Sequence, residues 1–125
     1  MTDNQLKSVA KALGTYAVVN SEGKLVNGFG IPVGSDYFLT PYSSRLIQDF
    51  LIAEGFNNIE YNDSHITDDP LLAIAEGEEW GVRLNEYNVQ RGIVNRSVEG
   101  AGTTPQEALL DACVKYIEQK EGKDA

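Results

Sequence analysis

Residues 80–119 read WGVRLNEYNVQRGIVNRSVEGAGTTPQEALLDACVKYIEQ, and this stretch decides the fold. The patterns over 80–84 and 92–98 predict the two strands of a hairpin. The small residues of 100–104 then predict a break in the chain. Thr104 and Pro105 suit the cap and first position of a helix, and Glu107 is placed to complete a capping box. Two strands followed by a capped helix are therefore expected.

The helix that begins at Pro105 has one apolar face and one charged face. Its apolar stripe consists of Leu109, Leu110, Cys113, Tyr116 and Ile117, with Glu107, Asp111, Lys115 and Glu118 opposite. We expect this stripe to cover one face of a sheet, because an amphipathic helix needs an apolar surface to pack on. Cys113 is the only cysteine, and its place in the stripe indicates a core residue rather than a reactive thiol.

The first part of the chain shows the same kinds of element. Threonine caps, helical spacing of apolar residues and glycine-containing turns all recur there. The predicted elements are a helix after Thr2, a hairpin over 16–26, a helix from Thr40-Pro41 to near Gly55 and a strand over 56–61.

Strands grouped between helices and joined by short connections predict an α+β protein. We expect a three-layer α-β-α sandwich on a mainly antiparallel sheet, because hairpins pair neighbouring strands antiparallel. With 125 residues, 42% of them hydrophobic, the chain can bury one core, so residues 1–125 are expected to form a single domain.

The two halves of the chain match at a shift of about 64 residues. Turn glycine, cap threonine and helix-start proline then recur in equivalent roles. The matches include Tyr16 with Trp80, Gly28 with Gly92 and Thr40-Pro41 with Thr104-Pro105. We interpret this pattern as a pseudo-duplicated helix-hairpin-helix unit with repeats at 2–61 and 67–121.

The formal net charge of -9 is unevenly distributed. No lysine or arginine lies between Arg45 and Arg83, where acidic residues are frequent. Nucleic-acid binding is not expected there, because such affinity comes mainly from basic residues that neutralise phosphates. The stretch instead fits a basic protein partner, and a solvated acidic face is the alternative. The residues expected to contact a partner are Asp63, Asp68, Asp69, Glu76, Glu78 and Glu79.

No apolar run approaches the roughly 20 residues that a membrane-spanning helix needs. Residues 1–13 are partly polar where a secretion signal would be apolar. We therefore expect a soluble, cytoplasmic protein with no membrane partner.

The familiar motifs of enzymes are absent from the sequence. It has no glycine loop ending in Lys-Ser or Lys-Thr, no His-Glu-x-x-His, no Cys-x-x-Cys and no Gly-x-Ser-x-Gly. His65, the only histidine, lies near Asp63, Asp68 and Asp69, and such nitrogen and oxygen ligands could hold a divalent ion, although a polar surface loop is the ordinary interpretation. We expect no metal, no cofactor and no enzymatic activity.

An alternative ligand site would use the arginines of the second hairpin. Strand alternation predicts that Arg83 lies on the face opposite Trp80 and Val82. Together with Tyr87, Arg91 and Arg96, it could contact an anion or a nucleotide base by bidentate bonding and stacking. Pairing of these arginines with acidic residues is the other interpretation.

The starts of the two major helices could contribute to the same ligand site. Ser43, Ser44, Thr103 and Thr104 offer hydroxyls and backbone N–H groups near the positive ends of helix dipoles, which suit a phosphate or carboxylate. Capping of the helices alone also explains these residues.

Three segments carry a resemblance to a known family. Pro41-Tyr42-Ser43-Ser44, the strand that begins at Trp80 and the segment 104–113, TPQEALLDAC, resemble small phage and prophage proteins with a phage ABA sandwich domain. The resemblance covers most of the chain from Leu6 onward, and the segment 62–79 departs from it by being longer and more acidic. The resemblance implies an α-β-α sandwich and a phage origin, but no catalytic or binding residues.

These observations favour a non-enzymatic phage accessory protein that binds a host factor through the acidic stretch and interferes with it. The alternative is a small-molecule binder that sequesters a host nucleotide signal at the arginine site. A homodimer would be compatible with either function, because the edge strands of an open sheet need to be covered.

Overall fold

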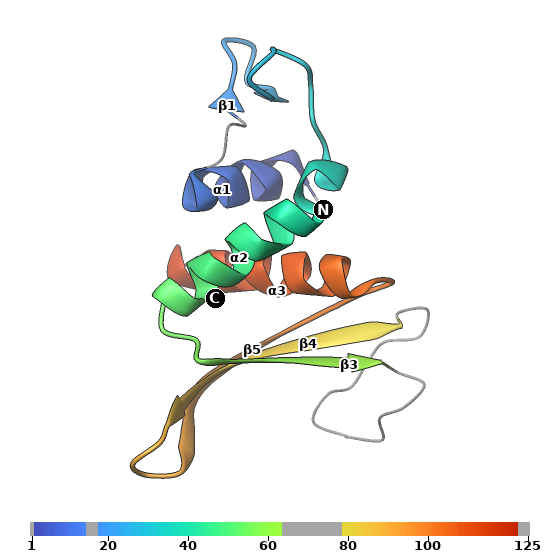
Figure 1. Ribbon diagram of the computed structural model, residues 1–125. Coiled ribbons are helices and arrows are strands. Elements are labelled where there is room, and N and C mark those ends of the chain that lie inside the picture. Colours follow the sequence, from blue (N-terminus) through green and yellow to red (C-terminus); the bar gives the residue numbers. More distant parts are fainter. Residues whose placement is uncertain (1, 15–17, 64–78, 123–125) are drawn as a thin grey trace.

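The computed structural model describes residues 2–14, 18–63 and 79–122 (Figure 1). The helices are α1 (Asp3–Leu13), α2 (Pro41–Ala53) and α3 (Pro105–Lys120), with a short 3-10 helix η1 (Ser35–Phe38). The strands are β1 (Val18–Val19), β2 (Leu25–Val26), β3 (Asn58–Asp63), β4 (Trp80–Asn88) and β5 (Ile93–Gly102). An antiparallel sheet has the order β3-β4-β5, and β1 and β2 form a separate antiparallel pair. The α+β class and the antiparallel sheet are therefore confirmed.

The helices lie on one side of the β3-β4-β5 sheet (Figure 1). Helix α3 packs on β4 and β5, and both α1 and α2 pack on α3. The small β1-β2 hairpin contacts α1, on the side away from the sheet. Among the described residues, the layers are thus sheet, helices and small hairpin, and no described helix covers the other face of the sheet.

The register of the sheet sorts the side chains onto two faces. Val82 and Leu84 of β4 are fully buried beneath the helices, and Val98 of β5 lies opposite Leu84. Directly opposed residues point to the same face, so Val98 joins this apolar surface. Arg83 lies between Val82 and Leu84 and pairs with residues of the other face, as strand alternation predicts.

The buried side chains form one hydrophobic cluster that includes residues of all three helices and of β2, β4 and β5. Phe38 and Phe56, from η1 and from the connection between α2 and β3, are completely buried in it. Burying an aromatic or aliphatic side chain of this size contributes about 1.5–3 kcal/mol relative to exposure. These two residues outside the major helices therefore help to hold α2 against the rest of the core.

Threonine caps begin all three helices, as predicted. Thr40 Oγ1 accepts from the N–H of Ser43 at 3.1 Å, and Thr104 Oγ1 accepts from the N–H of Glu107 at 3.2 Å. The predicted capping box at α3 has a different partner, because the Glu107 carboxylate accepts from the N–H and hydroxyl of Thr103, one residue before the cap. The helix start is therefore correct, while the reciprocal bond is displaced by one residue.

The predicted break at 100–104 is wrong for residues 100–102, which belong to β5. A Cβ on Gly100 would lie 2.5 Å from the carbonyl oxygen of Ala108 in α3. The small residues therefore permit close packing of α3 on the strand rather than ending the strand.

The first hairpin is present as predicted, although β1 and β2 contain two residues each and lie outside the main sheet. The second hairpin, β4-β5, contains nine- and ten-residue strands. The proposed repeat at 67–121 includes residues 67–78, which lie outside the described ranges. The pseudo-duplication stays a prediction.

Candidate functional site

A cleft of about 310 Å³ lies between α2, α3 and the adjoining ends of β3 and β4. This volume is at the small end of the range of about 300–1,000 Å³ that is usual for ligand pockets. Ser44, Gln48, Tyr61, Trp80, Pro105, Gln106 and Leu109 line the cleft. None of these residues carries a formal charge at neutral pH.

Two aromatic rings reach the cleft from neighbouring strands. Tyr61 of β3 pairs in register with Val82, so it shares the face of the sheet that the helices cover. Trp80 lies two residues before Val82 in β4 and therefore points to the same face. Tyr61 remains 40% exposed and Trp80 is half-buried, so the floor of the cleft is aromatic and accessible.

Helix α2 supplies the polar groups of one wall. Gln48 Nε2 donates to the Tyr61 hydroxyl oxygen at 2.8 Å. Burial raises the pKa of Tyr61, and the hydrogen bond from Gln48 offsets part of that shift. Ser44, one helical turn before Gln48, has a buried Oγ that makes no hydrogen bond within the part of the chain that the structure describes. Buried hydroxyls are normally paired, so this oxygen is a polar group of the wall whose bonding is incomplete.

The predicted arginine site is not assembled. Arg83 lies on the face of the sheet opposite the cleft, where its guanidinium pairs with Glu60 at 3.7 Å and with Glu99 at 3.3 Å. On the same face, Asn85 is only 2% exposed and bonds to Asn58 and Ser97 at 3.0 Å each. Arg83 is thus part of a polar ladder across the three strands.

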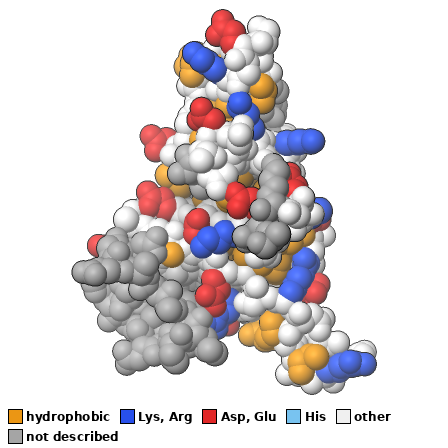
Figure 2. All heavy atoms as spheres, turned by 180° about the vertical axis from the view of Figure 1, so that it is seen from behind, with side chains coloured by type: hydrophobic (Ala, Val, Ile, Leu, Met, Phe, Trp, Pro, Cys, Tyr) orange, Lys and Arg blue, Asp and Glu red, His pale blue; other side chains and the backbone are white. Residues whose placement is uncertain are grey.

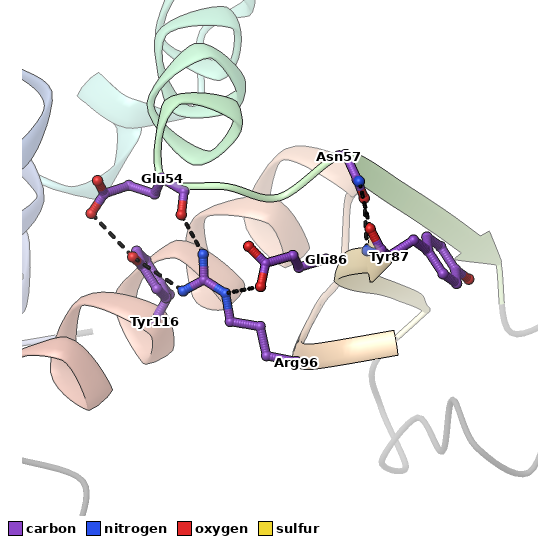
Figure 3. A network of polar contacts seen from close by, with 6 residues as sticks. All are labelled: Glu54, Asn57, Glu86, Tyr87, Arg96 and Tyr116. Carbon is purple, nitrogen blue, oxygen red and sulfur yellow. Dashed lines mark hydrogen bonds and ion pairs between the residues drawn. The ribbon is translucent and has the colours of Figure 1, made fainter. Parts of the chain in front are cut away.

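Arg96 lies on the helix side of the sheet, within a network of polar contacts (Figure 3). Its guanidinium donates to the backbone carbonyl of Glu54 and to the Tyr116 hydroxyl, and pairs with Glu86 at 3.4 Å. It also lies over the Phe56 ring, 4.3 Å from the centroid. These contacts join the end of α2 to β4, β5 and α3, so Arg96 has a structural role.

The carboxylate of Glu54 belongs to the same network. It accepts from the Tyr116 hydroxyl at 3.0 Å and pairs with Lys120. The hydrogen bond from Lys120, with a smaller contribution from Tyr116, holds the pKa of Glu54 below its ordinary value of 4.5.

Tyr87 lies near the end of β4 and Arg91 in the turn that leads to β5. This end of the hairpin projects from the body of the molecule (Figure 1). A bulge separates Tyr87 from Glu86, and the side chain of Asn57 bonds to both the N–H and the carbonyl of Tyr87 (Figure 3). Apolar side chains are exposed at this end, with Val89 85% exposed. Figure 2 shows hydrophobic side chains and a basic one on the tip that projects from the body. Arg83, Arg91 and Arg96 therefore occupy three separate places.

The predicted helix-start residues are used mainly as caps. Thr40 bonds to Ser43, whose hydroxyl donates to the Tyr37 carbonyl at 2.7 Å, and Thr103 bonds to Glu107. The side chain of Thr104 caps α3. Of these predicted ligand residues, Ser44 is the one that lines the cleft.

The acidic stretch is described only at its two ends. Asp63 ends β3 opposite Trp80, and Glu79 is exposed with its N–H bonded to the Gly102 carbonyl. Asp68, Asp69, Glu76, Glu78 and His65 lie outside the described residues. The acidic contact surface and the ion site at His65 thus stay predictions.

Gln48, Tyr61 and Gln106 are cleft residues that the sequence analysis did not select. Two local patterns point to Gln48 and Tyr61: Ser44 and Gln48 are four residues apart on one helix face, and Tyr61 shares a strand face with Ile59, two residues before it. Neither pattern shows that α2 faces Trp80, because that proximity depends on the pairing of β3 with β4.

A comparison with protein-family models, curated proteins and solved structures finds no match for this chain. The resemblance to phage ABA sandwich proteins therefore stays a prediction. Within the described ranges, no helix is both long and apolar enough to cross a membrane. Those ranges also contain no group of three metal-binding side chains.

Proposed function

We propose that this protein is a non-enzymatic binding protein that holds a small molecule in the cleft between α2, α3 and the sheet. The observation that supports it is a cleft of about 310 Å³ with Tyr61 and Trp80 on the sheet side and the polar side chains of Ser44 and Gln48 on α2. Pockets of this kind, mostly apolar with a few placed polar groups, are typical of small-molecule sites.

Binding is favoured over catalysis by the composition of the lining. General acid–base catalysis needs a group that titrates near the working pH. Of the seven described residues that line the cleft, Tyr61 alone is titratable, and burial raises its pKa further from neutrality. The lining is thus suited to holding a neutral molecule unchanged.

The positions of the arginines argue against the nucleotide signal that the sequence suggested as the ligand. A nucleotide signal held by its phosphates would need basic groups, but Arg83 and Arg96 are paired with carboxylates and none of the three hairpin arginines lines the cleft. The proposed ligand is therefore held by its rings and neutral polar groups.

Trp80 is the only tryptophan, so its fluorescence reports directly on the cleft. Titration with a library of small aromatic metabolites is expected to quench or shift this emission, and a ligand at 100 times its Kd should add about 2.7 kcal/mol to the free energy of unfolding. Tyr61→Ala should weaken binding, while Tyr42→Ala, at an exposed tyrosine of α2 outside the cleft, should not. Equal binding by both variants would contradict the assignment of the cleft.

A second candidate function rests on charge. The absence of lysine and arginine between Arg45 and Arg83 favours a host protein with a basic surface as the partner, in keeping with the phage resemblance and a cytoplasmic location. Neutralising Asp68, Asp69, Glu78 and Glu79 together should abolish capture of that partner. Capture that survives the four substitutions would exclude this surface as the contact with the partner.

Sedimentation velocity of the purified protein tests the predicted homodimer.

A further inference from the structure

The bond between Gln48 and Tyr61 leaves a donor and an acceptor next to each other in the cleft. The Tyr61 hydroxyl oxygen accepts from Gln48 Nε2, so its own proton can be donated elsewhere. The Gln48 carbonyl oxygen, with no hydrogen-bond partner among the described residues, remains an acceptor. With the amide reversed, the Tyr61 hydroxyl would donate to Gln48 Oε1, and the Gln48 NH2 group and the Tyr61 oxygen would be the donor and the acceptor left for a ligand.

The Ser44 hydroxyl adds a second polar point on the same helix face. Ser44 and Gln48 are four residues apart, and both line the cleft. Among the described residues the buried Ser44 Oγ has no partner, and leaving a buried hydroxyl unpaired is unfavourable. Rotation of this hydroxyl toward the cleft would let it pair with a ligand that has polar atoms along one edge.

The aromatic side of the cleft indicates the shape of the ligand. Tyr61 and Trp80 offer ring surface, and flat rings gain the most from aromatic contacts. Among the described residues that line the cleft, none has a charged side chain to neutralise a phosphate or carboxylate, so we expect an anionic group to remain outside.

From this arrangement we propose that the cleft binds an uncharged planar heterocycle with a ring amide, in which an N–H lies beside a C=O. The ring contacts Tyr61 and Trp80, and the amide edge bonds to the Tyr61 hydroxyl and the Gln48 side chain. This inference rests on the proposed function, since it specifies the ligand of the same cleft.

The test uses uracil and hypoxanthine as probes, with uracil methylated on both ring nitrogens as the matched control. The methylated ring keeps its flat surface but cannot donate. Trp80 fluorescence of the full chain is expected to show binding of a parent ring, and about tenfold weaker binding of the methylated one, which is the effect of one lost hydrogen bond.

Conservative variants test the two contacts separately. Tyr61→Phe keeps the ring and removes the hydroxyl donor, so it should weaken binding of both the parent and the methylated ring by about tenfold, because both keep a C=O that accepts from Tyr61. Gln48→Met removes the acceptor, so it should weaken binding of the parent ring and leave binding of the methylated ring, which has no N–H to donate, unchanged. Tyr42→Phe, at an exposed tyrosine, is the matched control and should change neither affinity.

The outcomes separate this inference from the proposed function. Equal affinities for the parent and methylated rings, with no effect of Tyr61→Phe, would overturn the ring-amide inference and leave small-molecule binding intact. Binding of other library compounds but of neither probe would also overturn it. No binding of any compound would overturn both proposals.

Discussion

Replacing Gly100 with alanine is expected to force α3 away from β5. A Cβ at this position would lie 2.5 Å from the Ala108 carbonyl oxygen and 2.7 Å from Ala112 Cα, whereas ordinary contact begins at 3.4 Å. The shortfall at the Ala108 oxygen is about 0.9 Å, and the backbone nitrogen of Ala112 lies closer still. All three atoms belong to the backbone of α3, so no side chain can rotate to relieve the clash.

The size of the expected loss of stability depends on how much of α3 is packed against the rest of the protein. Eight residues of α3 are buried, and the helix packs on β4 and β5 as well as on α1 and α2. Overpacking a core by a methyl group costs about 1–3 kcal/mol, and a clash with rigid backbone belongs at the upper end. For a chain of this size, about 3 kcal/mol lowers Tm by roughly 10 °C.

Urea unfolding followed by far-ultraviolet circular dichroism measures this loss. Gly34→Ala is the matched control, because a Cβ there meets no atom within 4 Å. Ala112→Gly should not restore stability to Gly100→Ala, since the clash involves backbone atoms. A Gly100→Ala protein within about 0.5 kcal/mol of the original, the usual range for neutral surface substitutions, would refute the close packing of α3 on β5.

Three further predictions concern the Arg96 network and the core. Arg96→Lys should lower the free energy of unfolding by about 1–2 kcal/mol, because an ammonium cannot make the forked contacts, while Arg91→Lys on the exposed hairpin end should have no effect in the same urea assay. Because the pKa of Glu54 is lowered in the folded protein, its contribution to stability is complete above its ordinary pKa of 4.5 and is lost as the pH falls through the lowered value. Tm measured from about pH 6 to about pH 3 should therefore fall less steeply for Glu54→Gln than for the original, and parallel curves would contradict this account. Burial raises the pKa of Cys113 to about 12, so thiol reagents should label it only on unfolding, and rapid labelling of the folded protein would place the thiol outside the core.

Local sequence patterns were sufficient to predict the helices and the antiparallel hairpins. Thr40-Pro41 and Thr104-Pro105 satisfy the free N–H groups of a helix start within a few residues, and such bonds form wherever the helix lies in the fold. Alternation along β4 likewise placed Arg83 opposite Val82, because side chains on a strand must alternate.

The sequence pattern around Gly100 was misleading because it has two physical explanations. Small residues are common in turns, but they also occur where two backbones approach closely. Only the position of α3 against β5 distinguishes the two, and that position depends on the packing of the whole core.

The candidate site shows the same division between sequence and tertiary structure. By itself, the sequence determined the α+β class, the capped helices and the face of β4 on which Arg83 lies, because each depends on residues a few positions apart. Only the tertiary structure places Gln48, Tyr61, Trp80 and Gln106 around one cleft. It also places Arg83, Arg91 and Arg96 at three separate positions. The physical reason is that strand pairing and helix packing set distances between residues far apart in the chain, and no local pattern encodes those distances.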